Sequence, residues 1–292
     1  MQLYGAIEAG GTKFVCAVAA SPGDLFIERV SFPTTTPSET IDQAISFFKK
    51  YTIKGLGIAS FGPVDLDPSS PTYGYITATP KLTWVNTDLL GPLRLALNVP
   101  MVFDTDVNGA ALGEMRYGAA QDVPSVVYFT IGTGIGGGAV INGQPLHGLV
   151  HPEMGHIPLK RHPSDHYAGH CPYHGDCLEG MACGPAIQAR WGESGGTLPA
   201  DHPAWALEAY YLAQAVTTVI YTLSPHRVIL GGGVMHQTQL FPLIQQKILE
   251  LLNGYITNPS TLEAMEKFIV PPGLGDDAGI RGALELARIA VG

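Results

Sequence analysis

Two glycine-rich segments of this chain carry donors of the kind that bind phosphate groups. Residues 8–13 read Glu-Ala-Gly-Gly-Thr-Lys, and residues 132–138 read Gly-Thr-Gly-Ile-Gly-Gly-Gly. Turns without side chains let backbone amides approach an anion closely, and consecutive amides in such turns form concave anion sites. Thr12, Lys13 and Thr133 add side-chain donors. Together the segments predict two phosphate-binding hairpins that face each other across a cleft.

An ordinary hairpin turn is the alternative for each segment taken alone, because glycine supplies the positive φ that tight turns need. Neither segment has the Gly-x-x-x-x-Gly-Lys-Ser/Thr spacing of a P-loop, and residues 134–138 match a dinucleotide fingerprint only loosely. The occurrence of two such turns with polar donors beside them favours phosphate binding.

A cluster of cysteine and histidine residues predicts a metal site. Three of the four cysteines lie within residues 171–183, which does not suit a disulfide framework in a chain this long. His156, Cys171, His174 and Cys177 offer four nitrogen or sulfur donors, enough to close a tetrahedral shell as in structural zinc sites. Surface histidines beside free thiols are the alternative, and the competing imidazoles are His162, His166 and His170.

Composition limits the functional class. The chain has 292 residues, 46% of them hydrophobic, and 25 acidic against 16 basic side chains give a net charge of −9. This length and apolar content support a large folded core, and the acidic balance disfavours nucleic-acid binding. Without a basic, apolar leader or an apolar run of about 18 residues, we expect a cytoplasmic protein with no membrane anchor.

Alternating strand and helix patterns position these residues in an α/β fold. Polar and glycine residues follow the strand at 55–59, and such strand ends usually bind ligands in open α/β sheets. A loop rich in Pro, Ser and Thr spans 66–84. The expected strands are 3–9, 13–20, 26–32, 55–59, 101–104, 126–130, 137–141 and 227–230, and the expected helices are 38–51 (capped by Ser38), 108–117, 205–223, 240–252 and 277–290.

The order of these motifs resembles the ROK family of sugar kinases over the whole chain. The matching stretches are Glu8-Ala-Gly-Gly-Thr-Lys13, Gly57-x-x-x-x-Gly-Pro-Val-Asp65, Asp106-Val-Asn108-Gly-Ala-Ala, Gly132-Thr-Gly-Ile-Gly-Gly-Gly138, His151-Pro-Glu153-Met-Gly-His156, Cys177-Leu-Glu179 and Leu230-Gly-Gly-Gly233. The resemblance implies a two-lobed actin-like ATPase (ribonuclease H-like) fold, with the nucleotide and the sugar in a cleft between the lobes. We expect one lobe from 1–105 with a returning helix at 278–292, and a larger lobe from 106–277 that carries the zinc segment.

Asp106 is the expected general base. Transfer of a γ-phosphoryl group requires an acceptor hydroxyl that is oriented in line and relieved of its proton, and a carboxylate in the cleft can do both. A helix cap at the start of the helix at 108–117 is the alternative role for this side chain, and the two roles are compatible.

The resemblance also assigns the binding residues. The sugar contacts it implies are Gly62, Asn108, Glu153, His156 and Glu179. His156 would bind the metal through one ring nitrogen and face the sugar with the other. Glu8 would orient water on Mg²⁺. The expected nucleotide and phosphate contacts are Gly10, Gly11, Thr12, Lys13, Thr133, Gly134, Gly232 and Gly233, of which Lys13 could instead be a solvated strand residue and the last two an ordinary strand-to-helix turn.

Residues 8–14 and the Thr79-Pro-Lys-x-x-Trp84 segment look most like the bacterial fructokinase branch. We therefore expect ATP-dependent phosphorylation of a hexose, most simply D-fructose to fructose 6-phosphate, by a homodimer. A mannokinase or glucokinase is the alternative, and a sugar-sensing regulator a more distant one. Two residues depart from the family pattern: Glu8 stands where Asp is common, and His174 replaces a cysteine of the zinc motif.

Overall fold

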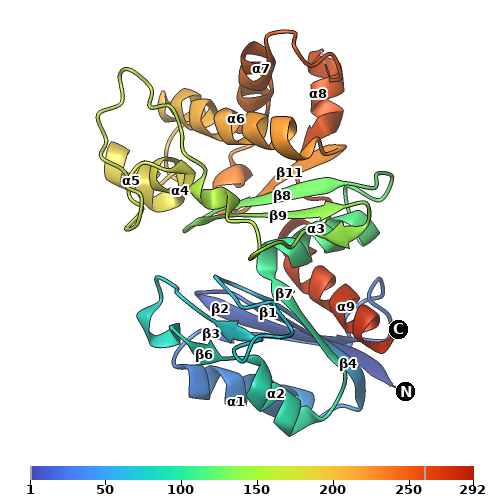
Figure 1. Ribbon diagram of the computed structural model, residues 1–292. Coiled ribbons are helices and arrows are strands. Elements are labelled where there is room, and N and C mark those ends of the chain that lie inside the picture. The colour runs from blue at the N-terminus through green and yellow to red at the C-terminus, as the bar shows by residue number, and fades with distance from the viewer. Residues whose placement is uncertain (1, 260) are drawn as a thin grey trace. The chain divides into compact units, whose positions relative to one another are not determined.

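The computed structural model describes residues 2–259 and 261–292, which divide into two compact units (Figure 1). Unit 1 comprises Met1–Gln121, Gly138–Pro152 and Asp276–Gly292, and unit 2 comprises Asp122–Gly137 and Glu153–Gly275. The contacts place helix α3 (Asp106–Tyr117) in unit 1, whereas the expected lobe boundary falls before it, at residue 105.

Unit 1 is built on a five-stranded mixed sheet in the order β3-β2-β1-β4-β7. The first three strands form an antiparallel meander, while β4 and β7 run parallel to β1. Ala9, Ser60 and Thr105 are register partners across the parallel strands. The turns after β1, β4 and β7 therefore leave the sheet at one edge. The strands are β1 (Leu3–Ala9), β2 (Lys13–Ala19), β3 (Glu28–Pro33), β4 (Ile53–Ser60) and β7 (Met101–Thr105).

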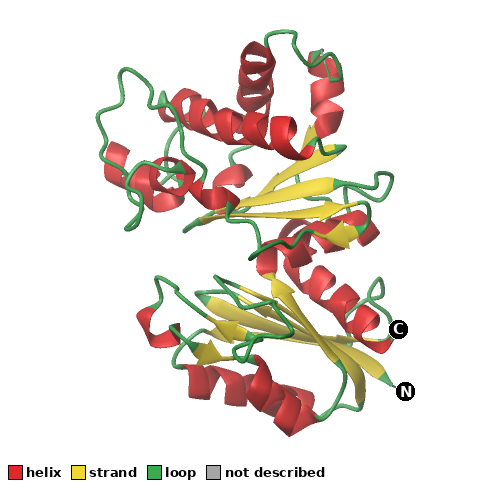
Figure 2. Ribbon diagram, in the orientation of Figure 1, coloured by secondary structure: helices red, strands yellow, loops and turns green. Residues whose placement is uncertain are grey.

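Helices cover both faces of this sheet (Figure 2). Helices α1 (Pro37–Phe48) and α2 (Leu90–Leu97) pack on one face around the buried Trp84, Phe14 and Phe48. On the other face α9 (Ala278–Val291) contacts β1, β4 and α3. The backbones of α3 and α9 nearly touch, since a Cβ on Gly282 of α9 would lie 1.7 Å from the carbonyl oxygen of Gly109 in α3.

A short hairpin and a 3₁₀ turn interrupt the loop that follows β4. The hairpin pairs β5 (Tyr75–Ile76) with β6 (Thr87–Asp88), and the 3₁₀ turn is η1 (Leu82–Trp84). Asp65 organises the start of this loop, because its carboxylate accepts hydrogen bonds from the hydroxyls of Ser70 and Thr72.

Unit 2 holds most of a second sheet, in the order β10-β9-β8-β11-β12, and the chain passes into unit 1 within β9. Strand β11 runs parallel to β8, with Thr130 opposite Gly231. The strands are β8 (Val126–Ile131), β9 (Ile135–Ile141), β10 (Gln144–Pro145), β11 (Arg227–Gly231) and β12 (Ile269–Val270), and the helices are α4 (Leu178–Ala182), α5 (Gly184–Trp191), α6 (Ala204–Leu223), α7 (Leu240–Leu252) and α8 (Leu262–Phe268). Three further 3₁₀ turns are η2 (Met154–His156), η3 (Gly233–His236) and η4 (Gly275–Asp277).

The long elements agree with the sequence predictions, and the differences lie at the ends of helices and strands and in short elements. Helix α1 is capped by Thr36 rather than by Ser38, because Pro37 occupies the first helical position and the Thr36 hydroxyl accepts from Glu39 N at 3.4 Å. Helix α3 begins two residues earlier than expected, since Thr105 caps it. Within the described residues, no helix combines the length and apolarity needed to cross a bilayer.

Candidate functional site

The first glycine turn joins β1 to β2 and presents its donors to solvent. Gly10 N donates to Lys13 O at 3.0 Å, and the Thr34 hydroxyl donates to Gly10 O at 2.7 Å, so the turn is held from within the unit. Gly11 and the side chains of Thr12 and Lys13 are exposed. A Cβ on Gly11 would meet no atom within 4 Å. The fold itself therefore does not require glycine there, whereas an approaching ligand would.

Glu8 lies beneath this turn on β1 and is only partly exposed. Burial raises the pKa of its carboxyl from 4.5 to about 7, against the opposing charges of Lys13 and Arg29. The start of α9 packs closely on it, since a Cβ on Gly279 would lie 2.6 Å from Glu8 Oε1. Near neutral pH the ligand-free protein thus holds this carboxyl poised between its two protonation states.

Asp106 is the first residue of α3 and follows β7 at the same sheet edge as the glycine turn. The helix cap is Thr105, whose hydroxyl accepts from Asn108 N at 3.1 Å. Asp106 is partly exposed, and its Oδ1 accepts from Val107 N at 2.9 Å. Thr105, and not Asp106, is therefore the N-cap of α3.

Asn108 lies one turn into α3 and is 1% exposed. Its amide nitrogen donates to Asp104 Oδ1 at 2.9 Å, and its carbonyl oxygen accepts from Ala139 N at 3.1 Å. The carboxylate of Asp104 also meets the imidazole of His147, with Nε2 at 3.0 Å from Oδ2. A contact between Asn108 and a sugar would use its second amide hydrogen or the second lone pair of its carbonyl oxygen.

The loop around Gly62 is tied to a second histidine of the same unit. His151 is 6% exposed, and its Nε2 accepts from Val64 N at 3.0 Å. Burial lowers the pKa of this imidazole, which suits an acceptor that must stay unprotonated. A Cβ on Gly62 would lie 3.4 Å from the His151 ring, so the ring packs directly on the expected sugar-binding loop.

Three glycine-bearing segments meet in unit 2 beyond the ends of β8 and β11. Gly184 N, at the start of α5, donates to Gly132 O at 2.8 Å, and a Cβ on Gly132 would lie 4.0 Å from Gly233 N. Gly232 has a φ of +88°, whereas a Cβ on Gly233 would meet no atom within 4 Å. Thr133 is exposed at the tip of the turn. The expected phosphate and adenosine contacts of this unit are thus adjacent.

Two carboxylates lie beside this second turn. Glu179 Oε2 accepts from Ile135 N at 2.9 Å and would lie 2.6 Å from a Cβ on Gly134, so a side chain there would displace the Glu179 carboxylate. Burial raises the pKa of Glu153 to about 7, and the charge of Glu179 adds to the effect. A carboxyl of this kind can both donate to and accept from sugar hydroxyls near neutral pH.

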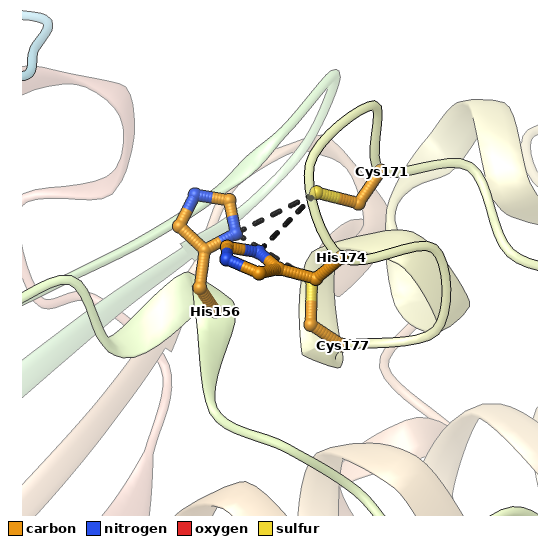
Figure 3. Close-up of side chains that lie close together, drawn as sticks. All are labelled: His156, Cys171, His174 and Cys177. Atoms are coloured by element: carbon orange, nitrogen blue, oxygen red, sulfur yellow. Dashed lines mark hydrogen bonds between the residues drawn. The ribbon is translucent and has the colours of Figure 1, made fainter.

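His156, Cys171, His174 and Cys177 converge in unit 2 (Figure 3), with one donor atom from each lying within 4.8 Å of the others. The Nδ1 of His156 is 3.5 Å from Cys177 Sγ and 3.8 Å from Cys171 Sγ, and His174 Nδ1 is 3.7 Å from Cys171 Sγ. Zn–S and Zn–N bonds of about 2.3 and 2.1 Å at a tetrahedral angle place sulfur and nitrogen about 3.6 Å apart. The four side chains therefore fit a zinc ion.

The cysteines of this tetrad are buried, and burial raises the pKa of Cys177 to about 11. A thiolate at this position needs a cation to hold it. His156 directs Nδ1 at the sulfur atoms while its other ring nitrogen points away from the cluster (Figure 3). The predicted grouping of the four residues is confirmed, and the identity of the ion stays a prediction.

The expected site residues are divided between the units. Gly62, Asp106 and Asn108 belong to unit 1 with the first glycine turn, and Glu153, His156 and Glu179 belong to unit 2 with the other two turns. A cavity of about 620 Å³ in unit 2, lined by Arg190, Trp191 and Tyr210 among others, contains none of them. The contact between Asp104 and His147 could not be predicted from the sequence, because 43 positions separate the two residues and neither belongs to a recognisable motif.

Comparison with known proteins places the chain in a family. The family model described as "ROK family" matches residues 4–290. The chain belongs to the ROK family. It is 50% identical to a putative fructokinase of Bacillus subtilis (strain 168), over 99% of this chain and 96% of that one. It is 46% identical to a fructokinase of Pediococcus pentosaceus over 99% of both chains.

The fold is that of a solved ROK hexokinase from Thermus thermophilus, with a TM-score of 0.78 and 24% identity over 99% of each chain. The predicted ROK membership and α/β actin-like ATPase fold are confirmed.

Proposed function

We propose that this protein is an ATP-dependent sugar kinase that converts D-fructose to fructose 6-phosphate. The observation that carries the proposal is the register of β1, β4 and β7, which brings the first phosphate turn, the Gly62 loop and Asp106 to one sheet edge. That geometry occurs in a ROK chain 46% identical, over its whole length, to a protein named fructokinase.

Asp106 accepts the proton of the attacking hydroxyl. The hydroxyl oxygen forms a bond to the γ-phosphorus of ATP while the bond to the β–γ bridging oxygen breaks, and ADP leaves. The carboxylate orients the hydroxyl in line and takes its proton as the P–O bond forms. The place of Asp106 at the first turn of α3 suits this role, because the side chain is partly exposed and is not needed as the cap.

The phosphates of ATP lie against the glycine turns. The residues that bind the phosphates and the adenosine are Gly10, Gly11, Thr12, Lys13, Thr133, Gly134, Gly232 and Gly233. Gly11 and Gly233 support this assignment, because the protein leaves open space where their side chains would be. Glu8, once its carboxyl is ionised, would hold a water molecule of Mg²⁺, an ion that would supply positive charge to the phosphates.

Hydroxyl groups of the sugar bind to Gly62, Asn108, Glu153, His156 and Glu179. The zinc tetrad orients His156 from behind, so that its free ring nitrogen can serve the sugar. A zinc ion held by these four residues would be structural, since the four protein donors would fill a tetrahedral shell. We also keep as predictions a homodimer and a cytoplasmic location.

The test is a coupled assay of ADP release with fructose, mannose, glucose and N-acetylated hexosamines, on the wild type and on Asp106→Asn. Fructose should give the highest kcat/KM. Asp106→Asn should keep sugar binding and lower kcat by several powers of ten, because an amide cannot accept the hydroxyl proton. A variant that retained more than a tenth of the wild-type kcat would remove Asp106 from the base role, and a preference for mannose or glucose would reassign the substrate.

A further inference from the structure

The carboxylate of Asp104 is the centre of a hydrogen-bond network two residues before Asp106. Asp104 is 2% exposed. Its Oδ1 accepts from Thr105 N at 2.7 Å and from Asn108 Nδ2 at 2.9 Å. His147 Nε2 lies 3.1 Å from Oδ1 and 3.0 Å from Oδ2, so it spans both oxygens. All four residues belong to unit 1.

The network fixes the protonation of His147. Its Nε2 and the amide nitrogen of Asn108 are 3.4 Å apart, and both point at the same carboxylate oxygen. Each must therefore donate, which places a hydrogen on Nε2. The hydrogen bond to Asp104 raises the pKa of His147. The hydrogen bond thus gives the Asp104 carboxylate a partner, without which its burial would carry a high free-energy cost.

These side chains hold the backbone on both sides of Asp106. Before it, Thr105 N donates to Asp104 Oδ1, and the Thr105 hydroxyl accepts from Asn108 N in the first turn of α3. After it, Asn108 is bound to Asp104 and, through Oδ1, to Ala139 N. His147 alone among these donors comes from the loop after β10, and its side chain is 43% exposed. Its removal would leave the Asp104 carboxylate with one fewer donor.

We propose that His147 is a positioning residue for phosphoryl transfer: by donating from Nε2 to Asp104, it fixes the turn that aims Asp106 at the acceptor hydroxyl. The inference rests on the proposed function, in which Asp106 is the base. Proton transfer depends steeply on base geometry, and a displacement of about 1 Å can cost about 100-fold in rate. The role is distinct from substrate binding, because His147 acts through Asp104 and Asn108.

The experiment compares His147→Ala with His147→Gln, whose amide can still donate to Asp104. We expect His147→Ala to lower kcat at least 10-fold with KM for ATP and fructose within about twofold, and His147→Gln to recover most of the loss. Because the side chain is 43% exposed, neither change opens a core cavity. The matched control is His226→Ala, at an exposed histidine of unit 2, which should leave all constants unchanged.

A second comparison combines Asp104→Asn with His147→Ala in a double-mutant cycle. If His147 acts through Asp104, the double variant with His147→Ala should be no slower than the slower single variant. A kcat within twofold of the wild type for His147→Ala, equal defects in the Ala and Gln variants, or multiplicative losses in the double variant would each overturn the inference. A rise in KM for fructose alone would identify His147 as a sugar contact and would also overturn it.

Amide hydrogen exchange separates this inference from the proposed function. In ligand-free protein, His147→Ala should speed exchange in peptides that cover residues 104–110 at least 10-fold and leave β8 and β11 unchanged. That result would support the network even if Asp106→Asn proved active and the assigned base were wrong. If Asp106→Asn is inactive but exchange at residues 104–110 is unaltered in His147→Ala, the base assignment stands and the positioning role fails.

Discussion

Replacement of Glu8 by glutamine should change how the stability of the ligand-free protein depends on pH. Burial raises the pKa of Glu8 from 4.5 to about 7, so the folded state holds a proton that the unfolded state has already released. Between these two values the folded state binds more protons, and stability must fall as the pH rises. The difference in pKa, at about 1.4 kcal/mol for each pH unit, corresponds to about 3 kcal/mol in total.

About 2.5 kcal/mol of this loss falls between pH 5 and pH 8. Glutamine has nearly the same shape as glutamate and cannot ionise, so the Glu8→Gln variant does not lose this stability as the pH rises. Urea unfolding without nucleotide or magnesium, at pH 5, 6, 7 and 8, gives the free energy of unfolding for both proteins. Wild type and Glu8→Gln should be nearly equal at pH 5, and the variant should be the more stable one at pH 8.

The difference between the two proteins is the quantity to follow, because burial also raises the pKa of Glu153 to about 7. Glu263→Gln is the control, since that side chain is 83% exposed and pairs with the exposed Lys267. A wild-type-minus-variant difference that stays flat within about 0.5 kcal/mol, or that favours the wild type at pH 8, would refute the reasoning.

Two further predictions concern the metal and the helix packing. Metal analysis should find about one zinc per chain, and Cys171→Ser with Cys177→Ser should remove both the ion and several degrees of thermal stability; full metal content in that double variant would show that other residues bind it. Gly282→Ala should destabilise unit 1 by about 3 kcal/mol in urea, because the added methyl group would lie 1.7 Å from Gly109 O. Gly196→Ala, where the nearest atom would be 3.9 Å away, should cost almost nothing, and equal midpoints for the two variants would contradict the packing described.

The features that could be predicted from the sequence are those that depend on residues close together in the chain. The hairpin around Gly10, the strand before Asp106 and the four metal ligands each lie within a short segment whose pattern carries its own meaning. Helix starts were less certain, because Thr36 and Ser38 are both good caps and the choice depends on Pro37.

Contacts between distant segments could not be predicted. Nothing in the sequence indicates that His147 reaches Asp104, or that Gly282 meets Gly109 across two helices. The burial that raises the pKa of Glu8 also depends on α9, which begins 270 positions later. Such features require the register of the sheet and the docking of the helices, which local patterns do not encode.

The return of α9 to unit 1 sets an order for folding during synthesis. Strand β1 ends at Ala9, yet the helix that covers β1 and β4 begins at Ala278, with unit 2 lying almost entirely between them. While the ribosome makes unit 2, the apolar face of the first sheet stays uncovered. Unit 2 can complete its own core before unit 1 does. The nascent chain therefore carries an exposed, aggregation-prone sheet for most of its synthesis, and a chaperone that shields such surfaces would matter most for the N-terminal part.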